Sequence, residues 1–111
     1  MNFKTLIKES YENAKEKGWH DVDRSIPELL CLVHSEISET LEEYRSGKNP
    51  NEIYYNPEKP EKPEGMPIEL ADVVIRIADF CGLFGVDLEE AIKIKLEYNK
   101  TRSYRHGNKR C

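Results

Sequence analysis

The segment from Ile68 to Phe80, IELADVVIRIADF, constrains the fold more than any other stretch of the chain. Its charged residues are Glu69, Asp72, Arg76 and Asp79, spaced i, i+3, i+7 and i+10. In an α-helix this spacing forms one narrow polar stripe, and the rest of the circumference is apolar. The segment is therefore predicted to be a central helix that packs against neighbours on most sides.

Three further segments also have helical periodicity and end signals, so four helices are expected, over residues 2–17, 25–46, 67 to 81 or 83, and 87–100. Capping boxes, SIPE at residues 25–28 and DLEE at residues 87–90, open the second and fourth helices. Gly18 and Gly47 stop the first and second, and Gly82 and Gly85 terminate the third. No strand pattern is found. The fold class is all-α, a four-helix bundle assembled through oligomerisation.

Residues 48–66 interrupt this pattern with the biased stretch PEKPEKPEG. Such a composition does not pack a core, so an exposed, extended loop is expected. It is either a plain linker or a flap over a site, with Tyr54 and Tyr55 as contacts. The tail, residues 102–111, has no periodicity.

The length of 111 residues fits one domain, residues 1–111, and the apolar content of 38% gives it a modest core. Some burial is therefore expected against another subunit. No apolar run is long enough for a membrane helix, and the mixed-charge N-terminus does not read as a signal peptide. Cys31 and Cys81 sit in apolar runs and are expected to be buried thiols. A cytoplasmic protein with no membrane partner is predicted.

Charge is divided along the chain. Residues 25–47 carry five acidic residues and one basic residue, residues 67–91 carry six and one, and residues 92–111 carry seven basic residues and one acidic residue. A cation site beside an anion site has this pattern, and so does an acidic surface with a basic tail.

Two carboxylate pairs, Glu36 with Glu39 and Glu69 with Asp72, lie beside apolar helix faces. If their helices pack together, the four groups repel one another and need protons or a cation. A hard divalent ion such as Mg²⁺ suits an all-oxygen site. The chain lacks the Glu-x-x-His pairs of di-iron bundles and a Cys/His zinc cluster. The plain alternative is a set of solvated helix faces, which is the interpretation for Glu42, Glu89 and Glu90.

Lys95, Asn99 and Arg102 continue the face that begins with Leu88 and Ile92. This face is expected to point inward and to become cationic near its end, where it can bind phosphate. The alternative is a basic helix C-terminus that complements the helix dipole.

These motifs together resemble the MazG-like nucleoside triphosphate pyrophosphohydrolases of the all-α superfamily. The similar features are the two acidic pairs in order, KGW at residues 17–19, LVHSEISETLEEYRSG at residues 32–47, and KLEYNKTR followed by HG. The long proline-rich loop between the acidic pairs departs from the family pattern. The resemblance covers nearly the whole chain.

The resemblance implies the reaction of an NTP or dNTP with water to give the monophosphate and pyrophosphate, for nucleotide-pool housecleaning. It implies Mg²⁺, or Mn²⁺ in its place, held by the four acidic side chains Glu36, Glu39, Glu69 and Asp72. It further implies substrate contacts from Lys95, Asn99 and Arg102, and a homodimer or homotetramer with sites near subunit contacts. No nucleic-acid polymer is expected as a partner.

Within this hypothesis Glu39 is the candidate catalytic carboxylate, which would orient or deprotonate water. Trp19 either stacks on the base or is a core residue, His34 has a supporting role, and His106 contacts phosphate. A narrower specialist for dUTP, dCTP or phosphoribosyl-ATP fits the same residues. The competing class is a non-catalytic helical module for oligomerisation or interaction.

Overall fold

The computed structural model describes residues 1–103, and its elements follow one another as helices interrupted by a single hairpin. The helices are α1 (Phe3–Glu16), α2 (Ile26–Arg45), α3 (Met66–Phe84) and α4 (Leu88–Lys100), with a short 3₁₀ turn, η1 (Trp19–Asp21), between the first two. The all-α class is therefore confirmed. The predicted tail beyond residue 103, with His106, lies outside the described residues.

Local capping explains where the helices begin. The Ser25 hydroxyl accepts a hydrogen bond from the Glu28 amide at 3.2 Å, and the Asp87 carboxylate accepts one from the Glu90 amide at 3.1 Å. Ser25 and Asp87 are thus the N-caps of the helices that they were predicted to start. Asn2 caps α1 in the same way through the Thr5 amide.

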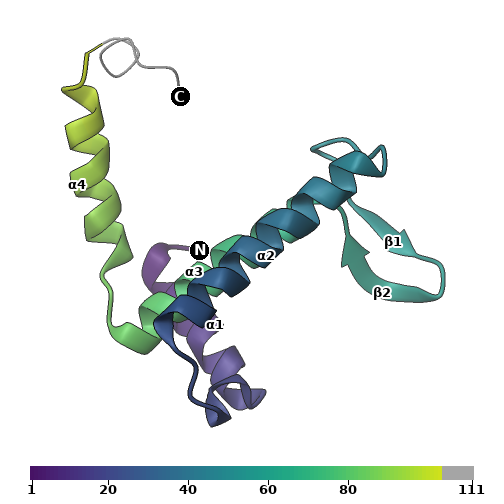
Figure 1. Ribbon diagram of the computed structural model, residues 1–111, viewed down its shortest axis with the longest axis horizontal. Coiled ribbons are helices and arrows are strands. Elements are labelled where there is room, and N and C mark those ends of the chain that lie inside the picture. Colours follow the sequence, from purple (N-terminus) through teal and green to yellow (C-terminus); the bar gives the residue numbers. More distant parts are fainter. Residues whose placement is uncertain (104–111) are drawn as a thin grey trace.

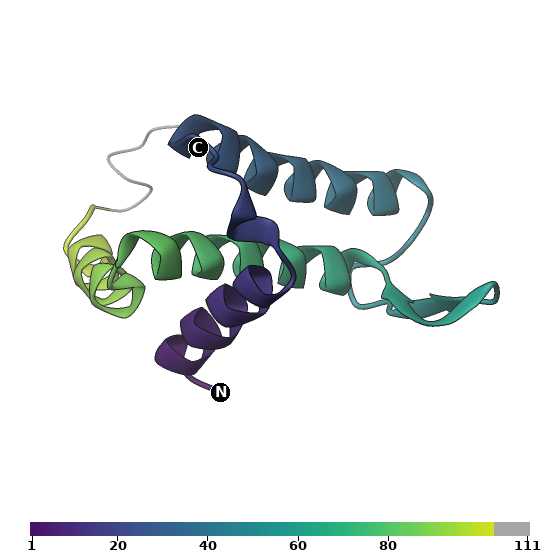
Figure 2. The ribbon, with the colours of Figure 1, turned by 90° about the horizontal axis from the view of Figure 1, so that it is seen from below.

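Helix α3 is the centre of the fold, as its sequence predicts. It runs antiparallel beside α2 and has α1 packed across its other side (Figures 1 and 2). Ala78 is fully buried and Cys81 nearly so, which confirms the expected burial of that thiol. Cys31 was expected to be buried too, but it is exposed on α2 because the apolar run around it covers both sides of that helix.

Gly82 has a different role from the one its sequence suggests. The prediction that it helps terminate the third helix is wrong, because α3 continues to Phe84 and ends at Gly85, whose backbone is left-handed. A β-carbon at Gly82 would lie 2.7 Å from the β-carbon of Tyr11. This glycine therefore permits the close packing of α1 on α3.

The proline-rich segment forms a β-hairpin, so the prediction that the chain has no strand is wrong. Strands β1 (Tyr54–Asn56) and β2 (Lys59–Glu64) are antiparallel, with Tyr54 opposite Glu64. The Asn56 side chain accepts a hydrogen bond from the Glu58 amide at 2.9 Å, which fixes the turn. Prolines hide the strand signal but are tolerated in an exposed two-stranded ribbon. The hairpin extends from the end of the helices, largely exposed as expected for the segment (Figure 1).

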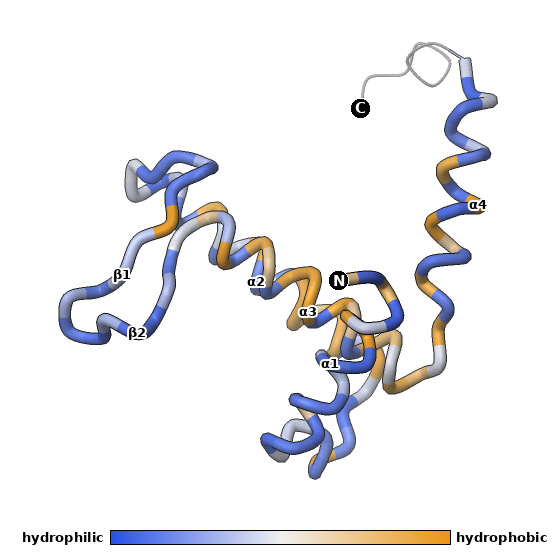
Figure 3. The backbone as a smooth tube through the Cα atoms, turned by 180° about the vertical axis from the view of Figure 1, so that it is seen from behind, coloured by the Kyte–Doolittle hydropathy of each residue, from blue (hydrophilic) through white to orange (hydrophobic). Residues whose placement is uncertain are grey.

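Helix α4 stands apart from the other three helices (Figure 1). Among the described residues it makes a slight contact with α1. Ile94, Leu96 and Tyr98 are all more than half exposed, and hydrophobic residues recur along this helix as they do along α2 and α3 (Figure 3). The radius of gyration is 16.8 Å, against about 13 Å for a compact domain of this length. Closure of a four-helix bundle through another subunit stays a prediction.

Candidate functional site

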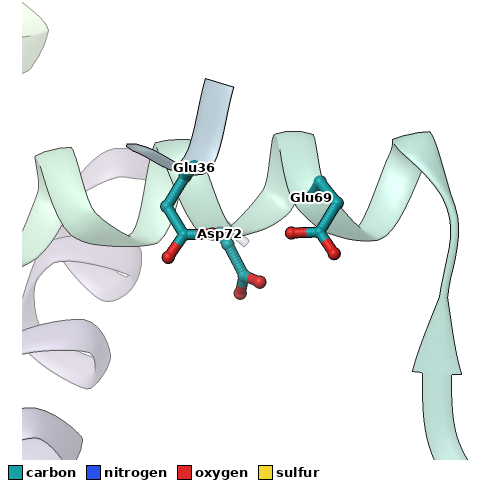
Figure 4. A group of neighbouring side chains, drawn as sticks. All are labelled: Glu36, Glu69 and Asp72. Carbon is teal, nitrogen blue, oxygen red and sulfur yellow. The ribbon is translucent and has the colours of Figure 1, made fainter. Parts of the chain in front are cut away.

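Three acidic side chains from two helices meet at one place. Glu36 comes from α2, and Glu69 and Asp72 come from the first two turns of α3 (Figure 4). One carboxylate oxygen of each lies within 4.8 Å of the others. The antiparallel packing of α2 on α3 brings Glu36 to this position, and the i, i+3 spacing gives Glu69 and Asp72 the same direction.

The cluster changes the acidity of its members. Burial raises the pKa of Glu69 above its ordinary 4.5, and the charges of Asp72, Glu36, Glu39 and Glu43 raise it further. Burial also raises the pKa of Asp72 above 3.8, with a further rise from Glu36 and an opposing effect of Arg76. Burial and the neighbouring carboxylates thus both favour the protonated, uncharged forms of Glu69 and Asp72.

Glu39 is exposed on α2 and is not part of this three-carboxylate cluster, Glu36, Glu69 and Asp72. It is nevertheless close enough for its charge to raise the pKa of Glu69. Its assignment as a fourth ligand, or as the catalytic carboxylate, stays a prediction. The cluster of three supplies the hard oxygen donors that Mg²⁺ and Mn²⁺ accept.

Arg76 connects the cluster to an aromatic residue. Its Nε donates to Glu36 Oε1 at 2.8 Å, and the Glu36 side chain is only 15% exposed. Its guanidinium also lies 5.0 Å from the centre of the Trp19 ring, which Arg24 approaches to 3.9 Å. The sequence places Arg76 on the acidic stripe but gives no sign of its partner, which lies 40 positions earlier.

A pocket of about 310 Å³ opens beside the cluster. Glu36, Asp72, Arg76 and Asp79 contribute its charged wall. The other side is formed by η1 and the face of α1, with Trp19, Asn13 and Ala14 among its lining residues. Trp19 is thus adjacent to the acidic cluster, as a substrate contact would have to be. Asn13 is not among the residues predicted for the site.

The base of the hairpin is attached to the same side of α2. The Tyr54 hydroxyl donates to the Glu43 carboxylate, at 2.8 and 3.0 Å from its two oxygens. This bond and the surrounding acidic charge raise the pKa of Tyr54 to about 12. Lys48 lies 4.2 Å from the centre of the Tyr54 ring. Tyr54 therefore anchors the hairpin to α2, and Tyr55 is exposed.

The predicted phosphate contacts are not brought to the cluster within one chain. Lys95, Asn99 and Arg102 are exposed, and α4 extends away from α2 and α3 (Figure 1). Lys95 and Arg102 instead lie near the Tyr98 ring, at 4.9 and 5.7 Å from its centre. Within residues 1–103 this face is exposed beyond Ile92, so the expectation that it points inward is wrong for that part of a single chain. His34 is exposed on α2.

Comparison with known proteins gives one short similarity. The chain is 50% identical over 38 residues to a dATP/dGTP diphosphohydrolase of Cyanophage S-2L, which is 34% of this chain and 36% of the relative. The chain thus spans about a third of the length of the curated relative it matches. No protein-family model and no solved structure matches it. Within residues 1–103, helices fall short of the length and apolar character that crossing a membrane requires.

Proposed function

We propose that this protein is a Mg²⁺-dependent nucleoside triphosphate pyrophosphohydrolase of the MazG-like kind. It would convert an NTP or dNTP and water into the monophosphate and pyrophosphate, in nucleotide-pool housecleaning. The observation that carries the proposal is the cluster of Glu36, Glu69 and Asp72, three carboxylates from two helices with an oxygen of each within 4.8 Å of the others. Burial and mutual repulsion raise the pKa values of Glu69 and Asp72, and Glu36 is paired with Arg76. The 38-residue similarity to a dATP/dGTP diphosphohydrolase supports hydrolysis of a nucleoside triphosphate in general.

The donor set fits a hard divalent cation. The three carboxylates would hold Mg²⁺, or Mn²⁺ in its place, with Glu39 as a fourth ligand or as the catalytic carboxylate. Bound there, the cation supplies positive charge against the triphosphate oxygens and makes water more acidic. Glu39 is exposed and near Glu69, so it is available to orient water and accept its proton. The nucleoside would lie beside Trp19 in the 310 Å³ pocket.

Arg76 is the cation next to the cluster and is already paired with Glu36, whereas the predicted phosphate contacts on α4 are not brought there within one chain. We therefore propose that Lys95, Asn99 and Arg102 act on the site of another subunit. The outer side of α2 supports such an assembly. It carries an apolar stripe of half-exposed residues, Ile26, Leu30, Ile37, Leu41 and Tyr44, whose spacing places them within roughly 60° of one another around the helix.

The competing proposal, a non-catalytic helical module, rests on that same apolar stripe. A substrate panel separates the two. The protein is incubated with Mg²⁺ and each common nucleotide, starting with dATP and dGTP, and the products are resolved. Pyrophosphate together with the monophosphate is expected. Release of orthophosphate would refute this reaction, and no turnover of any nucleotide would favour the module.

Site variants make the test specific to the cluster. Glu36→Gln and Asp72→Asn are each expected to abolish Mg²⁺-dependent turnover while the far-ultraviolet circular dichroism stays helical. Glu61→Gln removes an exposed carboxylate on β2 and serves as the matched control with unchanged rate. Rates like those of the wild type in the two cluster variants would remove these residues from the site.

A further inference from the structure

The turn η1 is held against α3 by a buried polar pair. His20 Nε2 lies 2.8 Å from Asp79 Oδ1, and the two side chains are 13% and 11% exposed. The His20 ring also packs near the Tyr11 ring, with 5.3 Å between centroids. A hydrogen bond this sheltered from water fixes the turn relative to α3.

The residue before His20 depends directly on that fixation. Trp19 begins η1, so its ring position follows the position of the turn. Its backbone carbonyl accepts a hydrogen bond from Arg24, whose guanidinium also covers the ring. The indole is thereby held as a platform beside α3, and Arg76 is the second cation that contacts it.

Arg76 extends this arrangement to the acidic cluster. It lies on α3 one turn before Asp79, contacts the Trp19 ring and donates to Glu36. Its side chain is 31% exposed, and the indole and the Glu36 carboxylate are the two groups that its guanidinium contacts here. The position of η1 therefore affects the orientation of the Glu36 carboxylate, because η1 places Trp19, Trp19 contacts Arg76, and Arg76 binds Glu36.

We propose that His20 and Asp79 are positioning residues for the cation site. They hold Trp19 against Arg76, and Arg76 in turn fixes the orientation of the Glu36 carboxylate. This inference rests on the proposed function, because it takes Glu36 as a cation ligand. Neither His20 nor Asp79 touches the cluster. Groups that orient a ligand through a hydrogen bond commonly change metal affinity by about 10- to 100-fold when they are removed.

The experiment titrates Mn²⁺ into the full-length protein and follows free Mn²⁺ by electron paramagnetic resonance. Emission from Trp19, the single tryptophan of the chain, reports on the turn in the same samples. His20→Ala removes the contact with Asp79, and His20→Gln restores a donor of similar reach. Asn2→Ala is the control, because it weakens the cap of α1 without touching the turn. Should His20→Ala lose helicity, His20→Asn takes its place.

We expect the Kd for Mn²⁺ to rise about tenfold in His20→Ala, with a red shift of Trp19 emission. His20→Gln should recover both values, and Asn2→Ala should leave both unchanged despite a lower Tm. A Kd in His20→Ala within twofold of the wild type, or an equal weakening in Asn2→Ala, would overturn the inference alone. A wild type that binds no Mn²⁺ would overturn the proposed cation site and this role with it.

Discussion

Replacement of Asp72 by asparagine should stabilise the cation-free protein. The substitution keeps the shape of the side chain and removes one of three negative charges within 4.8 Å of one another. Two unit charges at this distance repel by about 0.9 kcal/mol in water and about 3.5 kcal/mol at an effective dielectric constant near 20. The cluster is partly exposed and Asp72 also feels the attraction of Arg76, so a gain of about 1 kcal/mol is expected.

The assay is thermal unfolding with a chelator present, where this gain corresponds to a rise in Tm of about 4 °C. Addition of Mg²⁺ and nucleotide should reverse the order of the two proteins. The wild type gains about 2.7 kcal/mol when the ligand is at a hundred times its Kd, and a variant that does not bind gains nothing. The control variant Glu61→Gln should have the same Tm as the wild type under both conditions.

The pH dependence has a sign opposite to that of most carboxylates. Since the pKa values of Glu69 and Asp72 are raised, the folded protein binds more protons than the unfolded chain just above pH 4.5 and 3.8. The ionised forms of Glu69 and Asp72 destabilise the fold, and this effect is complete above their pKa values in the folded protein. It is relieved as the pH falls from those raised pKa values to the ordinary ones. Asp72→Asn should flatten this dependence. If the unfolding free energy of Asp72→Asn falls by 1 kcal/mol or more with the chelator present, the reasoning is refuted and Asp72 is a structural residue.

Three other outcomes follow from features away from the cluster. Ultraviolet titration should show Tyr54 ionising with a pKa of about 12. Its stabilising bond to Glu43 is therefore fully present below pH 10 and is lost as the pH rises through about 12. Glu43→Gln should return this value towards 10.0, and an unchanged titration would contradict the bond. Gly82→Ala should destabilise the protein by about 1–3 kcal/mol in urea, because Tyr11 must move; unaltered stability would contradict the close packing. Leu41→Lys should yield monomers in sedimentation equilibrium, whereas an unchanged mass would exclude the apolar stripe of α2 as the subunit contact.

The helices were predictable because their signals are local. The caps at Ser25 and Asp87 depend on residues three positions away, and the two ends of α2 agree with the prediction to within about a residue. The close position of Glu69 and Asp72 follows from helix geometry alone. That Glu36 joins them required only the assumption that α2 and α3 pack side by side.

Other features depend on distant partners and were not predictable. The pair of Arg76 with Glu36 and that of His20 with Asp79 join positions 40 and 59 residues apart. Periodicity shows which side of α4 is polar, but it does not show what that side packs against, and so Lys95 was expected to face inward. The hairpin was missed because Pro60 and Pro63 lack amide hydrogens, which a strand paired on both sides needs. In this two-stranded ribbon β2 is paired on one side alone, so the prolines are tolerated.

That free edge has a consequence for the behaviour of the protein in a crowded solution. An exposed strand normally presents amide and carbonyl groups on which another chain can extend the sheet. In β2 two of six residues are prolines without an amide hydrogen, and the others alternate between lysine and glutamate. A ribbon of this composition resists growth into intermolecular sheet, so the segment can protrude from the helices without seeding aggregation.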